Sequence, residues 1–356
     1  MKKNLAIVIT IISLTGLTSM NATAQDIHFS QFYENAILRN PALTGIFSGD
    51  FKAGVNYRNQ WSQISVPFRT VLASAETRIA VNPEVGDYLS FGVSATYDRA
   101  GAINFNSMQV YPAVNFNKAL EDKHNSYLSL GFTGGYIQRS VDLSKATFSS
   151  QYGGGGYDPL ASSGEQISHA VISNYDLGVG VSMNSSVGEA NNINYYVGLA
   201  GYHLTKPKQS FSQDELIRLD TKIVGNFGIK CDILDRYAFT GHFNYLAQGH
   251  YREVIAGGLF SWHSNPETEV NFAVYGGVFV RFKDAIIPTV KIDYKNYSFT
   301  TSYDLNTSSL KPASNGMGGV EMSLYVRGNY KKSARNGYQT RCPRFEDMMQ
   351  SSLQSF

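Results

Sequence analysis

The seven histidines are the residues of this sequence with the widest chemical range, because a histidine can bind zinc or act as a general base. They form no HExxH or His-x-His pattern, and no CxxC pattern occurs either, so no zinc-site motif is present. The histidines are His28, His124, His169, His203, His242, His250 and His263.

Three of the histidines are predicted at strand ends, where loops could bring them to acidic residues as a metal site or a hydrolase triad. These candidates are His169, His203 and His250, with Asp158, Asp214 and Glu253. The sequence has no G-x-S-x-G elbow and nothing else that specifies a nucleophile, so polar rim residues are the favoured interpretation. We therefore expect no enzyme, no catalytic residue, no metal ligand and no cofactor.

Cys231 and Cys342 are the only two cysteines. An exported protein can form disulfides, and a bond between these two would tie the C-terminal tail to the rest of the chain. Cys231 nevertheless alternates in phase with Ile223, Phe227 and Ile229, which places it on an apolar, lipid-facing side. The sequence leaves the pairing open.

The glycine run from Gly153 to Gly156 is the stretch that suggests phosphate binding. It lacks the Gly-Lys-Ser/Thr end of a P-loop and does not precede a helical pattern. A flexible surface loop is the favoured interpretation.

Extended segments of alternating polarity must position all of these residues. In residues 89–98, the apolar face consists of Leu89, Phe91, Val93, Ala95 and Tyr97. A soluble β-sandwich would alternate in the same way. Most of the runs, however, span roughly ten residues or more, which is typical of membrane-crossing strands rather than of soluble ones.

Counting these runs predicts an all-β fold, namely a transmembrane outer-membrane β-barrel of about 14 antiparallel strands. The predicted strands are 51–61, 68–80, 88–98, 104–117, 124–139, 171–186, 192–203, 222–233, 236–249, 251–263, 268–283, 286–296, 298–307 and 317–329. The connections provide a check, because such barrels have short periplasmic turns and longer outer loops. All three long connections, Ser140–Ala170, Leu204–Thr221 and Ser308–Gly316, fall at one end, which a sandwich would not require.

Four early charges, Arg58, Arg69, Glu76 and Arg78, are expected to face the interior of this barrel. They could line a pore or neutralise one another in a closed interior. The second alternative is favoured, because burying an unpaired charge is costly.

The residues before the first strand have helical spacing, which predicts a short plug helix from Phe29 to Ile37. Ser30 could cap this helix, and Asn40-Pro41 would stop it. Thr44-Gly45 then turns the chain. We expect this helix inside or under the periplasmic mouth of the barrel, with Phe29, Phe32 and Tyr33 packed against the wall.

The first residues are typical of a secretory signal peptide, with basic Lys2 and Lys3, an apolar run Leu5–Leu17 and a cleavage site at Ala22-Thr23-Ala24. Removing Lys2 and Lys3 leaves 28 basic side chains against 28 acidic ones, a balance that gives no support for nucleic-acid binding.

We expect the chain to have four parts. These are a signal peptide (1–24), an N-terminal helix/plug segment (25–50), a transmembrane β-barrel (51–329) and a periplasmic C-terminal tail (330–356). The tail would present a basic face formed by Lys331, Lys332, Arg335, Arg341 and Arg344.

Several motifs, in their order along the chain, resemble those of the PorP/SprF family. They are QDIHFSQFY (25–33), NPALTG (40–45), NYRNQW (56–61), FRT (68–70), GYHLTKP (201–207), QSF (209–211), SYDLNTSSL (302–310) and CPRF (342–345). Ile27 departs from the proline that many members carry before the histidine.

The resemblance implies an outer-membrane component of the type IX secretion system that aids the secretion or surface anchoring of specific cargo, such as large adhesins. Some members are linked to gliding, and one branch instead connects the secretion machinery to periplasmic peptidoglycan-associated parts. The outer loops Phe148–Asp158 and Leu204–Thr221, rich in Tyr, Gly and Ser, would suit protein contacts.

Two rival functions remain from the sequence. The first is an outer-membrane transporter of hydrophobic solutes resembling the long-chain fatty-acid type, which a solute-sized apolar lumen would favour. The second is an outer-membrane hydrolase, which no sequence motif supports.

Overall fold

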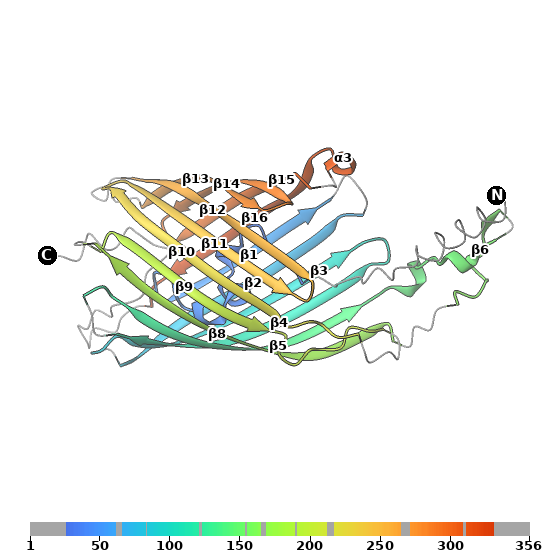
Figure 1. The fold of residues 1–356 in the computed structure, drawn as a ribbon, viewed down its shortest axis with the longest axis horizontal. Coiled ribbons are helices and arrows are strands. Elements are labelled where there is room, and N and C mark those ends of the chain that lie inside the picture. The colour runs from blue at the N-terminus through green and yellow to red at the C-terminus, as the bar shows by residue number, and fades with distance from the viewer. Residues whose placement is uncertain are drawn as a thin grey trace, which may run out of the picture.

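The computed structural model describes residues 26–61, 66–82, 84–120, 123–153, 155–164, 169–188, 191–211, 217–264, 271–308 and 311–330. Within these residues, 14 antiparallel strands form one closed barrel (Figure 1). They are β1 (Phe51–Gln60), β2 (Phe68–Asn82), β3 (Asp87–Ala100), β4 (Phe105–Ala119), β5 (Tyr127–Ser140), β8 (Val171–Val187), β9 (Ile193–Tyr202), β10 (Lys222–Leu234), β11 (Tyr237–Gln248), β12 (Tyr251–His263), β13 (Phe272–Arg281), β14 (Ala285–Tyr294), β15 (Tyr297–Asn306) and β16 (Met317–Gly328).

The strand order follows the chain, with β5 beside β8 and with β16 closing the barrel on β1. The closing pair is continuous from Phe51 opposite Gly328 to Gln60 opposite Gly319. The predicted antiparallel barrel is therefore confirmed, and its strand boundaries agree with the expected ones to within a few residues.

The two ends of the barrel differ in their connections. We call the end with the two-residue turns 235–236 and 295–296 the short-turn end. The loops 141–170, 203–221 and 307–316 all lie at the opposite end, here the long-loop end. This sorting confirms the predicted loop pattern.

The loop 141–170 extends well beyond the barrel (Figure 1). It carries two short 3-10 turns, η3 (Leu143–Lys145) and η4 (Ser149–Gln151), and a small hairpin of β6 (Tyr152–Gly153) and β7 (Gly156–Tyr157). The last long loop contains α3 (Lys311–Ser314). None of the helices in the described ranges is long and apolar enough to span a bilayer.

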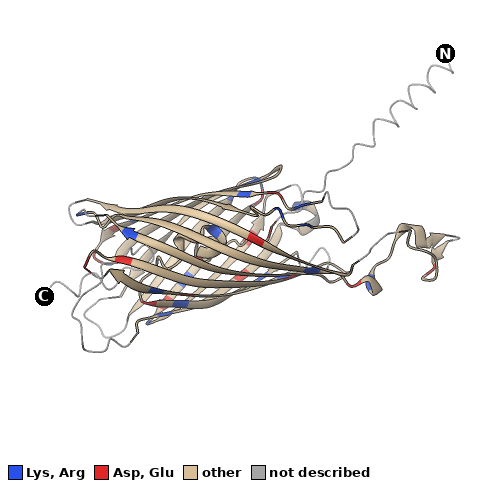
Figure 2. Ribbon diagram, turned by 90° about the horizontal axis from the view of Figure 1, so that it is seen from below, with Lys and Arg blue, Asp and Glu red and all other residues tan. Residues whose placement is uncertain are grey.

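Side chains alternate across the barrel wall because successive residues of a strand point to opposite faces. Val55, Leu130 and Leu324 are 47–49% exposed on the outside, where apolar side chains suit lipid. Inward positions are mostly polar or charged, and basic and acidic residues are interspersed along the barrel (Figure 2). The interior is therefore polar.

Residues 26–50, here the lumen segment, run lengthwise through the inside of the barrel (Figure 1, dark blue). The expected helix from Phe29 to Ile37 is wrong. The segment instead forms three short turns, η1 (Phe32–Glu34), α2 (Ala36–Arg39) and η2 (Pro41–Leu43).

The helix is interrupted because its polar groups bond to the barrel wall. Ser30 does not cap a helix, since its amide and hydroxyl donate to carboxylates of β15 and β16. Asn35, with φ −108° and ψ 78°, separates η1 from α2. The predicted stop is confirmed, because Asn40 is extended before Pro41, and Gly45 makes the predicted turn at φ +80°.

Candidate functional site

The candidate site is the contact between the lumen segment and the inner wall, and its first anchor lies at the long-loop end. Asp26 pairs with Lys222, and its carboxylate is 3.3 Å from Nε2 of His203. Nδ1 of His203 is 2.8 Å from Asp176 of β8. The lumen segment therefore begins near the long-loop end, and it lies inside the barrel, which is one of the two positions expected for it.

Electrostatics hold this first anchor in its charged form. Burial alone would raise the pKa of the Asp26 carboxyl, but Lys222 and His203 hold that pKa well below its ordinary value. Burial alone would lower the pKa of His203, and its bonds to Asp176 and Asp26 raise the pKa overall. The Asp26 carboxyl therefore stays ionised, and the His203 imidazole binds a proton more readily than an ordinary histidine side chain does.

The second anchor lies at Ser30 and Gln31. The backbone amides of these residues donate to the Glu321 carboxylate at 2.7 and 3.0 Å. The Ser30 hydroxyl donates to Asp304 at 2.6 Å. Arg58 of β1 pairs with both carboxylates, at 2.9 Å to Asp304 and 3.0 Å to Glu321, so the two buried carboxylates share this cation.

The third anchor is Glu34, whose carboxylate lies between Lys291 at 2.9 Å and Lys52 at 3.4 Å. Burial alone would raise the pKa of Glu34, but the two lysines lower it below its ordinary value overall. These lysines come from β14 and β1, so the anchor joins the lumen segment to two separate strands.

Aromatic packing holds the same stretch of the lumen segment against one side of the barrel. Tyr33 stacks on His242 and on Phe279, with ring centroids 5.1 and 5.0 Å apart. Phe32 meets Phe279 edge to face at 5.8 Å, a favourable arrangement of aromatic rings. Phe29, Phe32 and Tyr33 are all buried, which confirms the expected packing against the wall.

Glycines let the turn at residues 40–42 lie directly on the opposite wall. A Cβ atom at Gly131 of β5 would overlap backbone atoms of Pro41 and Ala42. A Cβ atom at Gly180 of β8 would overlap the Asn40 side chain in the same way. Here the wall contacts the backbone of the lumen segment without intervening side chains.

The four early charges have mixed outcomes. Arg58 faces the interior, as expected, and is neutralised there by acidic residues of distant strands. Glu76 and Arg78 also face inward, and each bonds the backbone of the lumen segment, at Gly45 N (2.9 Å) and at Phe47 O (2.8 Å). The expectation for Arg69 is wrong, because this side chain is exposed on the outer face of β2.

The structure does not bring the three candidate histidines together. His169 and His250 are exposed at the long-loop end, whereas His203 is buried in the first anchor, contrary to its interpretation as a rim residue. Asp214 lies outside the described residues. Among the residues that the structure describes, no group of three or more His, Cys, Asp or Glu could hold a metal ion.

Two further points from the sequence concern the cysteine pair and the glycine run. Cys231 is half-buried, and Cys342 lies outside the described residues, so the question of their pairing stays open. Gly153 and Gly156 pair across the β6–β7 hairpin at the tip of the loop 141–170. The signal peptide and the basic residues of the tail also lie outside the described ranges.

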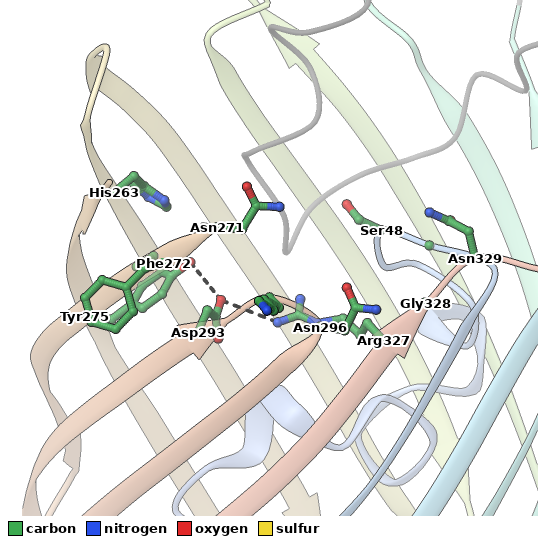
Figure 3. Close-up of a pocket in the computed structure, with 13 residues that line it drawn as sticks. Ser48, His263, Asn271, Phe272, Tyr275, Asp293, Asn296, Arg327, Gly328 and Asn329 are labelled. Carbon is green, nitrogen blue, oxygen red and sulfur yellow. Dashed lines mark hydrogen bonds and ion pairs between the residues drawn. The ribbon is translucent and has the colours of Figure 1, made fainter. Parts of the chain in front are cut away.

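A pocket of about 640 Å³, counting the space open to solvent, lies at the short-turn end (Figure 3). Ser48 and Gly49 of the lumen segment form one side of it. On the other side, Asp293 accepts a hydrogen bond from Tyr275 at 3.0 Å and pairs with Arg327 at 3.5 Å. The pocket therefore joins the end of the lumen segment to the barrel rim.

The long loops form a second candidate surface. The amide of His169 donates to the Phe211 carbonyl at 3.2 Å, which joins the loops 141–170 and 203–221. Asn174 of β8 donates to Lys208 O at 2.9 Å and ties the second loop to the barrel. On the β6–β7 hairpin, Tyr152 and Tyr157 contact each other with ring centroids 5.3 Å apart. Both tyrosines remain exposed, at 60% and 42%.

Together, these features define a closed transmembrane β-barrel whose interior is occupied by its own N-terminal segment. The chain belongs to the PorP/SprF family, because the model of the type IX secretion system membrane protein PorP/SprF matches residues 21–324. The protein is thus an outer-membrane component associated with type IX secretion. Family and fold indicate secretion or transport rather than an enzyme.

Solved structures with a partly similar barrel include a FadL homologue from Pseudomonas aeruginosa, with 11% identity and a TM-score of 0.48 over 80% of this chain and 91% of that one. The toluene transporter TbuX from Ralstonia pickettii has 9% identity and a TM-score of 0.47 over 82% of this chain and 93% of that one. These likenesses are too distant to indicate what this protein binds. No curated protein matches the sequence.

Proposed function

We propose that this protein is a dedicated partner for specific type IX cargo, such as a large adhesin, and that its barrel does not serve as a path for solutes. The observation that carries the proposal is the occupied lumen. The lumen segment is tied to the wall by buried ion pairs at Asp26 and Glu34 and by the Ser30 contacts with Glu321 and Asp304. The surfaces left for function are the two ends of the barrel.

In this proposal the short-turn end faces the periplasm and the long-loop end faces the outside. The parts of the chain are then a signal peptide (1–24), an N-terminal plug segment (25–50) that includes the lumen segment, the barrel (51–329) and a periplasmic tail (330–356). The amide of Tyr330 donates to Asp50 at 2.9 Å, which supports a tail that leaves from the short-turn end. Its basic residues would meet a periplasmic partner.

The long loops would contact the cargo. The β6–β7 hairpin and the residues after it expose Tyr152, Tyr157 and Leu160, the last at 94%. Exposed aromatic and apolar side chains on an adaptable loop suit a protein partner, because such side chains supply most of the energy of protein contacts. A role in gliding would follow if the cargo is a motility adhesin.

The rival transport function would need an apolar path through the barrel. The described inner wall instead carries many buried charged side chains, among them Lys52, Arg58, Lys291 and Glu321. Moving a hydrophobic solute past them would require displacing the lumen segment. This weighs against the transporter of hydrophobic solutes.

Surface proteomics of a deletion strain tests the proposal. We expect the loss of one or two large adhesins from the cell surface while other type IX cargo is still secreted. Loss of all type IX cargo would instead indicate the core-machinery branch of the family. Normal levels of every type IX substrate, with failed uptake of a hydrophobic solute, would replace the proposal with the transporter function.

A further inference from the structure

Arg39 of the lumen segment is a buried arginine without a carboxylate partner among the described residues. It is 6% exposed. One of its terminal nitrogens donates to the Tyr196 hydroxyl at 2.6 Å, and its guanidinium carbon lies 5.3 Å from the Tyr196 ring centroid. Its Nε has no hydrogen-bond partner. Because a buried, unpaired charge is costly, an anion at this position would be stabilising.

Arg39 lines a pocket between the lumen segment and the strands β10–β12. The space measures about 450 Å³, counting its open mouth. Much of its lining is apolar and comes from both sides. The apolar residues are Ile27, Phe29, Phe32, Leu38, Val224 and Leu246.

The polar part of the lining leaves several hydrogen-bonding atoms unused within the described residues. Nδ2 of Asn35 and Oδ1 of Asn244 have no partner, although the two residues are only 5% and 6% exposed. Glu253, the one carboxylate in the lining, is already engaged by Tyr251 at 2.9 Å and by Arg281 at 3.7 Å. Buried polar groups normally have partners, so these atoms mark a place for a polar group from outside the chain.

We propose that this pocket binds a small amphipathic carboxylate, whose carboxylate group pairs with Arg39 and whose apolar body lies against Phe29, Phe32 and Leu246. The ligand would enter from the long-loop end, where Lys222 begins β10. Since it would contact both the lumen segment and the wall, it would stabilise the occupied lumen by mass action. The inference does not depend on which cargo the protein serves.

Octanoate is a suitable probe because it carries a carboxylate on a short apolar chain. Equilibrium dialysis of the purified full-length barrel in maltoside detergent, with the octanoate bound by protein-free detergent subtracted, measures its binding. We expect saturable binding at one octanoate per chain. Acetate and octanol should each bind at least about tenfold more weakly, because each lacks one half of the interaction.

Variants on both sides of the pocket identify the site. Arg39→Gln should weaken octanoate binding at least about tenfold, whereas Arg39→Lys should restore most of it. Leu246→Trp changes the strand wall and should abolish binding by filling the apolar part. Arg139→Gln is the matched control, because Arg139 is also buried without an ion pair among the described residues but does not line this pocket.

Heat-modifiable migration of each variant on gels verifies that the barrel is folded, and the comparison uses the folded variants. Loss of octanoate binding in Arg39→Gln and Leu246→Trp, with binding kept in Arg139→Gln, supports the site. Equal binding of octanol and octanoate, no saturable binding, or binding unchanged in both pocket variants would overturn it.

Discussion

The lumen segment is buried and bonds to residues far away in the sequence, whereas the loop 141–170 is largely exposed and bonds to residues close by in the sequence. Ser30 and Gln31 are nearly inaccessible, and their carboxylate partner Glu321 is about 290 residues away along the chain. In the loop, Gln151 donates to the Ala161 carbonyl at 3.0 Å, only ten residues away. Leu160 beside it is 94% exposed.

The difference separates the structural part of the molecule from the part that is free to recognise a partner. The buried charges of the three anchors have partners far away in the sequence, so a change there affects distant parts of the barrel. The loop stabilises itself through local contacts, so its exposed residues can change without affecting the barrel. We expect stability to depend on the lumen segment and cargo specificity to depend on the long loops.

The largest effect should follow from Arg58→Ala in the second anchor. The substitution leaves the carboxylates of Asp304 and Glu321 buried without their main cation, which typically costs about 3–5 kcal/mol. Urea unfolding of the barrel in detergent measures the loss. Arg69→Ala, on the exposed outer face of β2, is the control and should change stability by less than about 0.5 kcal/mol; equal effects would contradict the anchor.

The next effect in size should come from Gly131→Val, where the added side chain would overlap the backbone of Pro41 and Ala42. Overpacking of this kind costs about 1–3 kcal/mol, and here it should displace the lumen segment and open an ion path. Gly134→Val in the same strand is the matched control, since a Cβ atom at Gly134 would meet nothing within 4 Å. Conductance in planar bilayers should rise in the first variant only, and a rise in both would refute the contact.

A smaller effect concerns pH and His28 at the start of the lumen segment. Burial, helped by Arg281 and Arg58, lowers the pKa of His28 from 6.5 to about 4. The unfolded chain therefore binds a proton more readily than the folded one, so stability falls as pH decreases from 6.5 towards 4. His28→Gln should flatten this part of a urea-midpoint profile against pH, and an unchanged slope would show that other groups control it.

The smallest effect on stability should come from Tyr152→Ser combined with Tyr157→Ser. Both side chains are exposed at the loop tip, so the unfolding free energy should change by less than about 0.5 kcal/mol. The amount of cargo at the cell surface should nevertheless fall severalfold, because the aromatic anchors are lost. Normal surface cargo in this variant would argue against the hairpin as the contact.

The strands were predictable because their alternation is a local pattern, and the sorting of loop lengths then followed from the strand order. The outward orientation of the Arg69 side chain could also have been predicted from the sequence. Arg69 lies seven residues before Glu76, and an odd separation within one strand places two side chains on opposite faces.

The path of the lumen segment could not be predicted from its own residues. Helical spacing is local, whereas the groups that break the helix, Glu321 and Asp304, belong to the last two strands. His203 was missed for the same reason, since its partner Asp26 comes from the far end of the chain. The anchors could have been suspected from one feature of the sequence, namely charged residues such as Glu321 at inward positions of alternating strands.

The most direct test of the account is the conductance of the unmodified, full-length protein in planar bilayers. The occupied lumen predicts no steady ion conductance, and deletion of residues 26–45 from a folded barrel should produce a stable open channel. A large, steady conductance of the unmodified protein would contradict the closed lumen. It would thereby remove the main support for a cargo partner over a transporter.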